Sequence, residues 1–283
     1  NLMSNNELTI VINTFKSEEK IHNCLNSVNI DQKVIVVENS DNENFKKQIE
    51  KKYSNVQCIL TGENLGYAKG NNLGLSLVKT KYALIINPDA EVDNQSINNF
   101  FLTAKNKPDF AIIAPFIQEA RISEPSEKEN KGVYEVKSVK GFAMFLNLDQ
   151  FKDIGFFDEN FFIYFEEIDL CKRIVQKKKK IFLDTNIKIK HAGGTSHEDS
   201  INYEMEKSRN WHWMWSSFYF HKKHYGYTIA LLKILPKFFS AIIKTIYFKI
   251  ISNNEKKEIY YCRFEGILNS ILMRKSWYRP KIN

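Results

Sequence analysis

Short runs of apolar residues recur along the first two thirds of the chain, and each ends at a turn or a breaker. Such runs predict buried strands, which we expect at residues 8–12, 33–37, 56–60, 83–86 and 110–115. After the first run, Ile21, Cys24, Leu25 and Val28 follow the helical period, and Ser17 is the expected N-cap. Apolar strands that alternate with helices are typical of an α/β fold with a parallel sheet covered on both faces.

Weaker patterns extend this prediction towards the middle of the chain. We expect helices that end near residue 53 and span 94–105 and 151–157, and further strands over 139–146 and 181–183. Residues 118–132 are polar and charged, which predicts either a loop over the functional site or a solvated excursion.

A dense aromatic helix is predicted around residues 211–220, and Lys222, Lys223 and His224 follow it. Aromatic side chains among basic ones can stack nucleic acid bases. A helix in the core, or one near a membrane interface, is the simpler interpretation.

Residues 228–252 are mostly apolar but are interrupted by lysines, and Pro236 is expected to kink this helix. Lys233, Lys237 and Lys244 fall within about 40° of one another at the helical period. A basic stripe on an apolar helix is typical of a segment that lies in a bilayer interface, and an amphipathic core helix with solvated lysines is the alternative. On the first interpretation, much of the apolar surface comes from Leu231, Ile234, Leu235, Phe238, Ile242 and Ile246.

The composition is that of a globular protein, with 43% apolar and 26% charged residues among 283. The net charge of +8 favours anionic partners such as nucleotide diphosphates, nucleic acid or an anionic membrane. The four cysteines lack C-x-x-C spacing, so we expect reduced, mostly buried thiols in a cytosolic protein. We expect no signal peptide, and no ordinary transmembrane helix because no apolar run of about 18 residues occurs.

Asp89 follows the apolar run at 83–86 directly after Asn87 and Pro88. Pro88 cannot donate to a sheet ladder, so the strand stops and presents Asp89 at its carboxyl end. In open α/β sheets that edge is where ligands bind, and a carboxylate there suits a hard divalent cation on a diphosphate. The alternative is that Asp89 is part of an ordinary Pro-Asp turn.

Several glycines and asparagines lie between Asn64 and Gly74, which predicts a loop that runs into a helix. The backbone at Gly66 and Gly70 is able to approach a ligand closely. The spacing matches neither G-x-G-x-x-G nor a P-loop, so it does not by itself predict a phosphate site. A plain turn before a weak helix start is the alternative.

A second group of acids follows an aromatic run and opens a predicted helix at Glu166. At about 100° per residue, Asp169 and Arg173 form an i,i+4 pair on the face of Glu166, whereas Glu167 aligns with the apolar face. A carboxylate on an apolar face is buried or lines a cleft, and partial desolvation would raise its pKa towards that of a useful base. The alternative is a glutamate that only complements the helix dipole.

His191 leaves a predicted strand into a Gly-Gly loop. A histidine in this position can bind a metal ion or donate to a phosphate. A hydrogen-bonded loop histidine is the simpler interpretation.

From about residue 8 to about 225, the chain resembles the family 2 glycosyltransferases, and among them the bacterial rhamnosyltransferase-like members. The joint order of several motifs carries this resemblance: Val11-Ile12-Asn13-Thr14-Phe15, Val36-Val37-Glu38-Asn39-Ser40, Asn64-Leu65-Gly66, Gly70-Asn71-Asn72-Leu73-Gly74, Ile86-Asn87-Pro88-Asp89-Ala90, Gly141-Phe142-Ala143-Met144, Gly155-Phe156-Phe157-Asp158-Glu159-Asn160-Phe161-Phe162 and Glu166-Glu167-Ile168-Asp169-Leu170 with Arg173.

The resemblance implies a GT-A type nucleotide-sugar-binding α/β domain over residues 1–225, with a mixed, mostly parallel sheet. Helices over 226–283, which we expect to associate with a membrane, would follow it. The nucleotide-sugar pocket would contain Thr14, Phe15, Glu38, Asn39, Asn64, Gly66, Gly70, Asn71, Asn87 and Asp89. The acceptor would be bordered by Gly141, Asp158 and Glu166.

By the same resemblance, Glu167 would be the catalytic base, and Asp89 with His191 would bind Mg²⁺ or Mn²⁺ on the diphosphate. Two departures from the family pattern matter. The Asn87-Pro88-Asp89 motif has one acid where many members have two, which favours a weaker metal dependence. Glu38 and Glu167 stand where Asp is commoner, and each is one methylene longer.

The implied reaction is inverting transfer of a sugar, with rhamnose as the first candidate, from a nucleoside-diphosphate sugar. The expected acceptor is a lipid-linked or polysaccharide glycan in cell-surface or O-antigen synthesis, at the cytoplasmic face of the membrane. The alternatives are a nucleotidyltransferase, for which Asn13-Thr14-Phe15-Lys16 is a poor first loop, and a catalytically inactive membrane-surface module, against which Asp89 and Glu167 argue.

Overall fold

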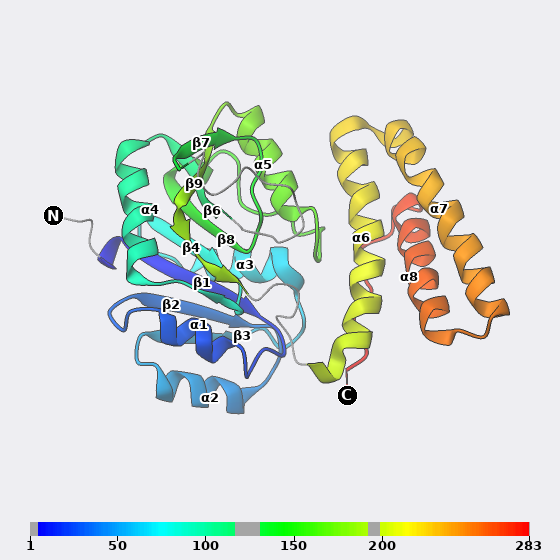
Figure 1. Cartoon of the computed structure of the whole chain (residues 1–283), viewed down its shortest axis with the longest axis horizontal. Coiled ribbons are helices and arrows are strands. Elements are labelled where there is room, and N and C mark those ends of the chain that lie inside the picture. Colours follow the sequence, from blue (N-terminus) through cyan, green and yellow to red (C-terminus); the bar gives the residue numbers. More distant parts are fainter. Residues whose placement is uncertain (1–4, 117–130, 192–198, 283) are drawn as a thin grey trace. The chain divides into compact units, whose positions relative to one another are not determined.

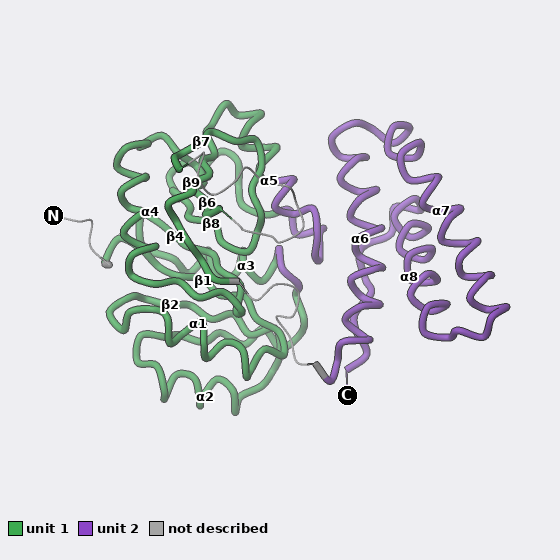
Figure 2. The backbone as a smooth tube through the Cα atoms, viewed as in Figure 1, with its two compact units in different colours: residues 1–65, 69–157, 170–198 green, residues 66–68, 158–169, 199–283 purple. Residues whose placement is uncertain are grey.

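The computed structural model describes residues 5–116, 131–191 and 199–282. It divides into two compact units, shown in Figure 2, and each is described here by itself. Unit 1 contains residues up to 65, 69–157 and 170–198, and unit 2 contains 66–68, 158–169 and 199–283. The loop predicted over 118–132 lies almost wholly outside the described residues.

Unit 1 is built on a mixed sheet of eight strands in the order β3-β2-β1-β4-β8-β6-β9-β7 (Figure 1). Their bounds are Leu8–Thr14 (β1), Lys33–Glu38 (β2), Val56–Leu60 (β3), Tyr82–Ile86 (β4), Phe110–Phe116 (β6), Val133–Val136 (β7), Ala143–Asn147 (β8) and Lys180–Lys188 (β9). The first four strands run parallel, whereas β8 is antiparallel to β4 and β6. The predicted α/β fold with a mixed, mostly parallel sheet is confirmed.

The helices of unit 1 follow the strands in alternation. They are Ile21–Ser27 (α1), Glu43–Lys52 (α2), Gly66–Ser76 (α3), Asn94–Asn106 (α4) and Glu166–Gln176 (α5), and the first turns of α3 and α5 group with unit 2. α2 packs on β3, and α4 packs on β6 and β9. Under α4, the rings of Tyr82, Phe100 and Phe110 stack around Phe145, with centroid separations of 5.1–5.8 Å. The apolar strands of the sheet form the core of unit 1 because helices cover both faces of the sheet.

Three local predictions are wrong. Ser17 is not the N-cap of α1, because the helix begins at Ile21 and the carbonyl of Ser17 accepts from the Ile21 N–H at 3.0 Å. The helix predicted over 151–157 is replaced by a 3₁₀ turn at Leu148–Phe151. The strand predicted over 139–146 begins only at Ala143, and β7 was not predicted because its side chains are half-buried or exposed and show no apolar run.

Unit 2 is dominated by three helices, Asn202–Tyr225 (α6), Tyr227–Ile250 (α7) and Asn254–Ile271 (α8). Met214 and Phe218 of α6 pack with Ala230 and Ile234 of α7 and with Ile267 of α8. α7 is a single helix in which Pro236 is an interior residue. The predicted division at residue 225/226 into a catalytic domain and a membrane-associated segment stays a prediction. In the part of the chain that the structure describes, no helix is long and apolar enough to cross a membrane.

Gly266 of α8 lies directly against the backbone of α6 at Trp211. A Cβ at this position would overlap the carbonyl oxygen of Trp211 and lie 3.1 Å from the carbonyl carbon of that residue. The contact is made by backbone atoms, so it cannot be relieved by a change of rotamer. Close packing of α8 on α6 therefore requires glycine here.

We expect Gly266→Ala to destabilise the protein by about 1–3 kcal/mol, the usual cost of overpacking. In a helix without this contact, the same change would stabilise the protein by about 1 kcal/mol. The sign of the change in unfolding free energy therefore shows whether the helices are in close contact. Chemical denaturation measures the difference, and Ser240→Ala on the exposed side of α7 serves as a control that we expect to be neutral or mildly stabilising. A more stable Gly266→Ala variant would contradict the close contact.

Candidate active site

The carboxyl ends of β1 and β2 lie side by side and carry three of the predicted nucleotide-sugar residues. Thr14 pairs with Glu38 in the parallel register, and the Asn39 N–H donates to the Thr14 carbonyl at 2.9 Å. The Asn39 amide also donates to Asn13 Oδ1 at 2.5 Å and accepts from the Leu65 N–H at 3.0 Å. Asn39 therefore joins the ends of two strands to the chain that leads into α3.

Two buried oxygens at this edge make no hydrogen bond among the residues that the structure describes: Thr14 Oγ1 and Glu38 Oε2. The other carboxylate oxygen of Glu38 accepts from the Ser40 hydroxyl at 2.7 Å. A buried polar atom without a partner is costly, and it commonly marks a place that a ligand completes. The edge is thus suited to a polar ligand that donates to a carboxylate and a hydroxyl.

Glu38 titrates in an unusual range. Burial raises the pKa of Glu38 to about 7, although the hydrogen bond from Ser40 favours the ionised form. Between about pH 4.5 and this value, the native state holds a proton that the unfolded state has released. Stability therefore falls as the pH rises through that window.

We expect Glu38→Gln to remove this pH dependence. Without nucleotide, titration of Glu38 should lower the unfolding free energy of the wild type by about 3 kcal/mol between about pH 4.5 and pH 7.5. The variant should lack this contribution. Chemical denaturation at both ends of the window measures the difference. Parallel stability profiles for the two proteins would show that Glu38 titrates normally.

The glycines of α3 serve packing inside the protein. A Cβ on Gly70 would overlap the amide of Asn13, and one on Gly74 would lie 2.5 Å from Val11 Cγ1, so both residues allow α3 to lie close to β1. Asn71 is buried and Asn64 is half-buried on the same segment. At Gly70 and Gly74 the close approach is made to a strand of the sheet, and the approach of this backbone to a ligand stays a prediction.

Asp89 is half-buried, with Oδ1 buried, and follows β4 after Asn87 and Pro88. The next two residues form β5 (Ala90–Glu91), which pairs antiparallel with β10 (Lys190–His191), so that His191 lies opposite Ala90. The backbone of His191 thus lies across the ladder from the residue that follows Asp89, so the two predicted metal ligands are close in space although distant in sequence. The side chain of His191 lies outside the described residues.

A residue predicted to bind the nucleotide sugar, Asn87, also lies close to one predicted to border the acceptor, Gly141. The Asn87 N–H donates to the carbonyl of Phe142 at 2.9 Å, which places Gly141 close to the turn that carries Asp89. Phe15, at the end of β1, and Gly141 are both half-buried.

A divalent cation at this edge would need ligands beyond the side chains that the structure describes. Among the described residues, no group of three or more His, Cys, Asp or Glu side chains is arranged to hold a metal ion. Mg²⁺ is usually bound through one or two carboxylates together with substrate phosphates and water. Asp89 fits the role of that carboxylate.

The predicted acid pair opens α5 as expected, since the helix begins at Glu166. Tyr164 and Phe165, just before it, have φ values of 71° and 69°, a conformation that costs non-glycine residues energy and clusters at functional sites. Glu166 is buried, whereas Glu167 is half-buried with Oε2 buried. Burial and the neighbouring Glu167 raise the pKa of Glu166 well above the ordinary carboxyl range.

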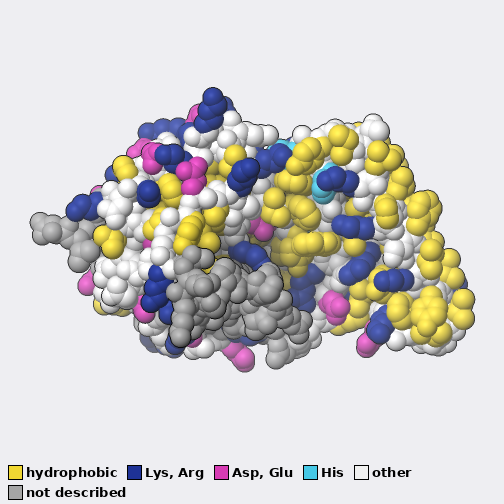
Figure 3. All heavy atoms as spheres, turned by 45° about the horizontal axis from the view of Figure 1, so that its top comes forward, with side chains coloured by type: hydrophobic (Ala, Val, Ile, Leu, Met, Phe, Trp, Pro, Cys, Tyr) yellow, Lys and Arg dark blue, Asp and Glu magenta, His cyan; other side chains and the backbone are white. Residues whose placement is uncertain are grey.

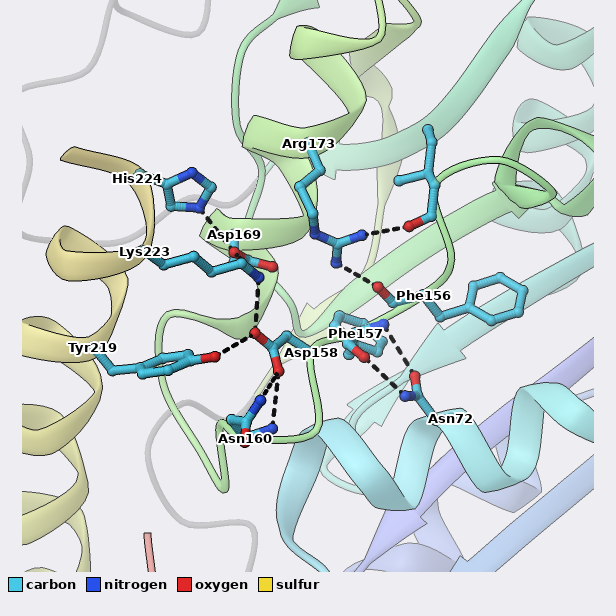
Figure 4. Close-up of polar contacts among 11 residues, drawn as sticks. Asn72, Phe156, Phe157, Asp158, Asn160, Asp169, Arg173, Tyr219, Lys223 and His224 are labelled. Carbon is cyan, nitrogen blue, oxygen red and sulfur yellow. Dashed lines mark hydrogen bonds and ion pairs between the residues drawn. The ribbon is translucent and has the colours of Figure 1, made fainter. Parts of the chain in front are cut away.

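Two other carboxylates fasten the segment that carries this pair to α6 (Figure 4). Asp158 accepts from Tyr219 at 2.9 Å and from Lys223 at 2.8 Å, and its other oxygen accepts from the backbone and side chain of Asn160. Burial opposes ionisation of Asp158, but Lys223 and Asn160 outweigh it and lower the pKa below the usual value. Asp158 thus has a positioning role within unit 2.

Asp169 is completely buried and also bonds to α6. Its Oδ1 lies 2.7 Å from Lys223 Nζ and 2.8 Å from His224 Nε2. Lys223 therefore bridges Asp158 and Asp169, at the two ends of the segment (Figure 4). A buried carboxylate with such partners is costly to unpair, so this cluster holds the start of α5 in place.

Aromatic and backbone contacts support the same segment between these ends. Ser216 of α6 donates to the Ile163 carbonyl at 3.0 Å, and Phe162 stacks on His212 with centroids 4.5 Å apart. The Phe162 carbonyl accepts from the Tyr67 N–H at 2.7 Å. Gly66, with φ +79°, lies so close to Phe162 that a Cβ would overlap it, so this glycine too is required by packing.

Arg173 has a role that its spacing did not predict. Its guanidinium donates to the carbonyls of Ile154, at 2.9 Å, and Phe156, and Asn72 bonds to both backbone groups of Phe157 (Figure 4). These contacts fix, within unit 1, the chain that precedes Asp158.

Tyr219, Lys223 and His224 were not predicted as partners of these carboxylates. The sequence contained part of the signal, because Tyr219 and Lys223 are four residues apart on one face of a predicted helix. That buried Asp169 and half-buried Asp158 need partners follows only from the structure.

A comparison with protein families identifies the chain. The sequence profile described as Glycosyl transferase family 2 matches residues 9–171, which is more than half of the 283 residues. This match contains β1 from its second residue, the Asp89 turn and the acid pair.

Two characterised proteins are similar in sequence. The low-salt glycan biosynthesis hexosyltransferase Agl10 of Haloferax volcanii is 28% identical over 192 residues, which are 59% of this chain and 61% of Agl10. The rhamnosyltransferase WbbL of Escherichia coli is 24% identical over 239 residues, 72% of this chain and 88% of WbbL.

A solved structure is similar in fold. The mannosyltransferase PcManGT of Pyrobaculum calidifontis, in complex with GDP-Man and Mn²⁺, superposes with a TM-score of 0.57 at 11% identity, covering 95% of this chain and 88% of PcManGT. At this identity the likeness establishes the GT-A type fold alone. The fold and the extent of the sequence match agree, and the chain belongs to the glycosyl transferase family 2.

Proposed function

We propose that this protein transfers a sugar from a nucleoside-diphosphate sugar to a lipid-linked or polysaccharide acceptor in cell-surface glycan synthesis. The observation that carries the proposal is a pair of buried oxygens, of Thr14 and Glu38, at the carboxyl edge of the sheet, which accept or donate no hydrogen bond within the described parts of the chain. In a family 2 chain, this edge suits the nucleotide. The similar proteins Agl10 and WbbL, a hexosyltransferase and a rhamnosyltransferase, support a hexose as the transferred sugar.

Thr14, Glu38 and Asn87 are proposed to bind the nucleotide, and Asp89 to approach the diphosphate as the protein ligand of Mg²⁺ or Mn²⁺. When bound, the cation would neutralise charge on the departing diphosphate. His191 is a second proposed ligand. Gly141, which lies close to the turn that carries Asp89, is proposed to border the acceptor.

Glu167 is proposed as the general base. Its carboxylate takes the proton of the acceptor hydroxyl while that oxygen bonds to the anomeric carbon, and the bond from this carbon to the diphosphate oxygen breaks. A single displacement from the opposite face inverts the configuration. The contacts of Asp158 and Asp169 with α6 support this role because they hold the start of α5 in place.

The test is a thermal-shift screen across nucleoside diphosphates and their sugars with Mn²⁺ or Mg²⁺, followed by assays of donor hydrolysis and transfer. dTDP-rhamnose is the first donor to test because WbbL matches most of the chain. A ligand at 100 times its Kd should stabilise the fold by about 2.7 kcal/mol, and Thr14→Val should weaken that shift. The proposal fails if no nucleotide sugar shifts the melting temperature or is hydrolysed, and pyrophosphate release from a nucleoside triphosphate would favour a nucleotidyltransferase.

A further inference from the structure

α7 exposes an apolar stripe to solvent. Its members recur every three or four residues along the helix, with a seven-residue gap at exposed Pro236, and between 45% and 75% of the surface of each is exposed. We call this set the outer stripe: Ile229, Leu232, Phe239, Ile243, Ile246 and Ile250. This spacing places them on one face of the helix, and exposed apolar surface of this extent marks an interaction site.

The opposite face of α7 explains why this stripe is free. Ala230, Ile234 and Ala241 are buried, and Leu231 and Phe238 pack against the cluster formed with α6 and α8. Of the six apolar residues that the sequence pattern predicted to be on the membrane-facing surface, only Ile246 is therefore strongly exposed. That prediction chose the packed face of a helix that is apolar nearly all round.

Positive charge accompanies the stripe. α7 contains four lysines and no acidic residue, and Lys233, Lys237 and Lys244 follow the same edge of the stripe at helical spacing. Residues 199–283 carry 15 Lys and Arg against 6 Asp and Glu, a net charge of +9, so they account for all of the +8 of the chain. Figure 3 shows hydrophobic side chains with Lys and Arg among them over the helices at its right-hand side.

The charge pattern decides between two occupants of this face. A second copy of the chain would bring another α7, which has lysines but no carboxylate to pair with them, and helix pairs normally place opposite charges beside the apolar seam. An anionic lipid surface supplies both a negative charge for the lysines and an apolar layer for the stripe. Only the lipid surface complements both features.

We propose that the outer stripe of α7 binds the surface of an anionic lipid bilayer, with the helix axis in the membrane plane. The stripe residues enter the boundary between headgroups and acyl chains, and Lys233, Lys237 and Lys244 reach anionic headgroups. The inference does not depend on the proposed glycosyl transfer, since it concerns a face that contains none of the proposed site residues.

The test is flotation of the full chain with phosphatidylcholine vesicles that do or do not contain phosphatidylglycerol. We expect binding to the anionic vesicles only, weakened by added salt. Changing Lys233, Lys237 and Lys244 together to Gln should reduce partitioning by about 100-fold. Changing Leu232, Phe239 and Ile243 together to Ser should reduce it by about 10-fold or more, and circular dichroism should show unchanged helix content because all three side chains are exposed.

Two controls match these variants in composition. Lys47, Lys51 and Lys105 are exposed lysines of unit 1, and their triple change to Gln removes the same charge. Ile30, Leu77 and Leu102 are exposed apolar residues of unit 1, and their triple change to Ser removes comparable apolar surface. We expect both controls to float like the wild type.

Three outcomes would overturn the proposal. The first is failure of the wild type to bind anionic vesicles. The second is an equal loss of binding in the control variants. The third is that the wild type does not bind vesicles but forms a dimer in analytical ultracentrifugation, and that the variant changed at Leu232, Phe239 and Ile243 is a monomer. This result would make the stripe an interface between copies of the chain.

Discussion

Glu167→Gln is expected to lower turnover by about 100-fold or more, the usual loss when a general base is removed, while donor binding stays unchanged. The substitution keeps the size of the side chain and removes only its ability to take a proton. Glu167 is half-buried at the start of α5, in a segment that the carboxylates of half-buried Asp158 and buried Asp169 hold to α6. The fold should therefore tolerate the change.

Turnover and donor affinity, measured separately, check this prediction, and Glu166→Gln is the matched control. Because burial and Glu167 raise the pKa of Glu166 well above the usual range, Gln resembles its protonated form, and we expect little loss. The acidic limb of the pH–rate profile should disappear in the Glu167 variant alone. A loss in Glu166→Gln with none in Glu167→Gln would move the role of base to Glu166.

The strands were predictable because most are buried on both faces. β1, β2 and β4 read as apolar runs that stop at polar residues, and their bounds agree with the structure within two residues. β7 has no such run because its side chains are half-buried or exposed, and its place is fixed by pairing with β9. Pairing between distant segments is not encoded in local periodicity.

The same limit explains which contacts of the candidate site could not be predicted. Pro88 predicts from local chemistry that Asp89 stands at a strand end, and the structure confirms that position. The partners of Asp158 and Asp169 come from α6, more than fifty residues later, and only the packing of unit 2 brings them together. Likewise, the sequence suggests that Gly70 faces a ligand, whereas in the structure the side chain of Asn13 lies against it.

α7 shows a third kind of limit. A helix that is apolar nearly all round does not reveal which side packs, because its hydrophobic pattern supports more than one face. Contacts with α6 and α8 select the face of Ala230, Ile234 and Ala241 and leave the outer stripe exposed.

Asp89→Asn is expected to lower donor affinity and turnover together, by on the order of 100-fold in turnover, because a metal ion that stabilises a diphosphate is worth several kcal/mol. The amide keeps the shape of the side chain but lacks the negative charge that hard cations require. Asp89 is the only acid of the Asn87-Pro88-Asp89 turn, so no neighbour in that motif replaces it.

Titration of the nucleotide sugar with and without Mn²⁺ checks this prediction through binding alone. The wild type should gain affinity when Mn²⁺ is added, whereas the Asp89→Asn variant should bind equally weakly in both conditions. Asp93→Asn is the matched control, since it removes the same charge four residues later from a side chain that caps α4 by accepting from the Ser96 N–H at 2.7 Å. Asn caps a helix as well as Asp does, so the control should keep both stability and the response to Mn²⁺. Full activity of Asp89→Asn in chelator-treated buffer would show that Asp89 does not bind the metal.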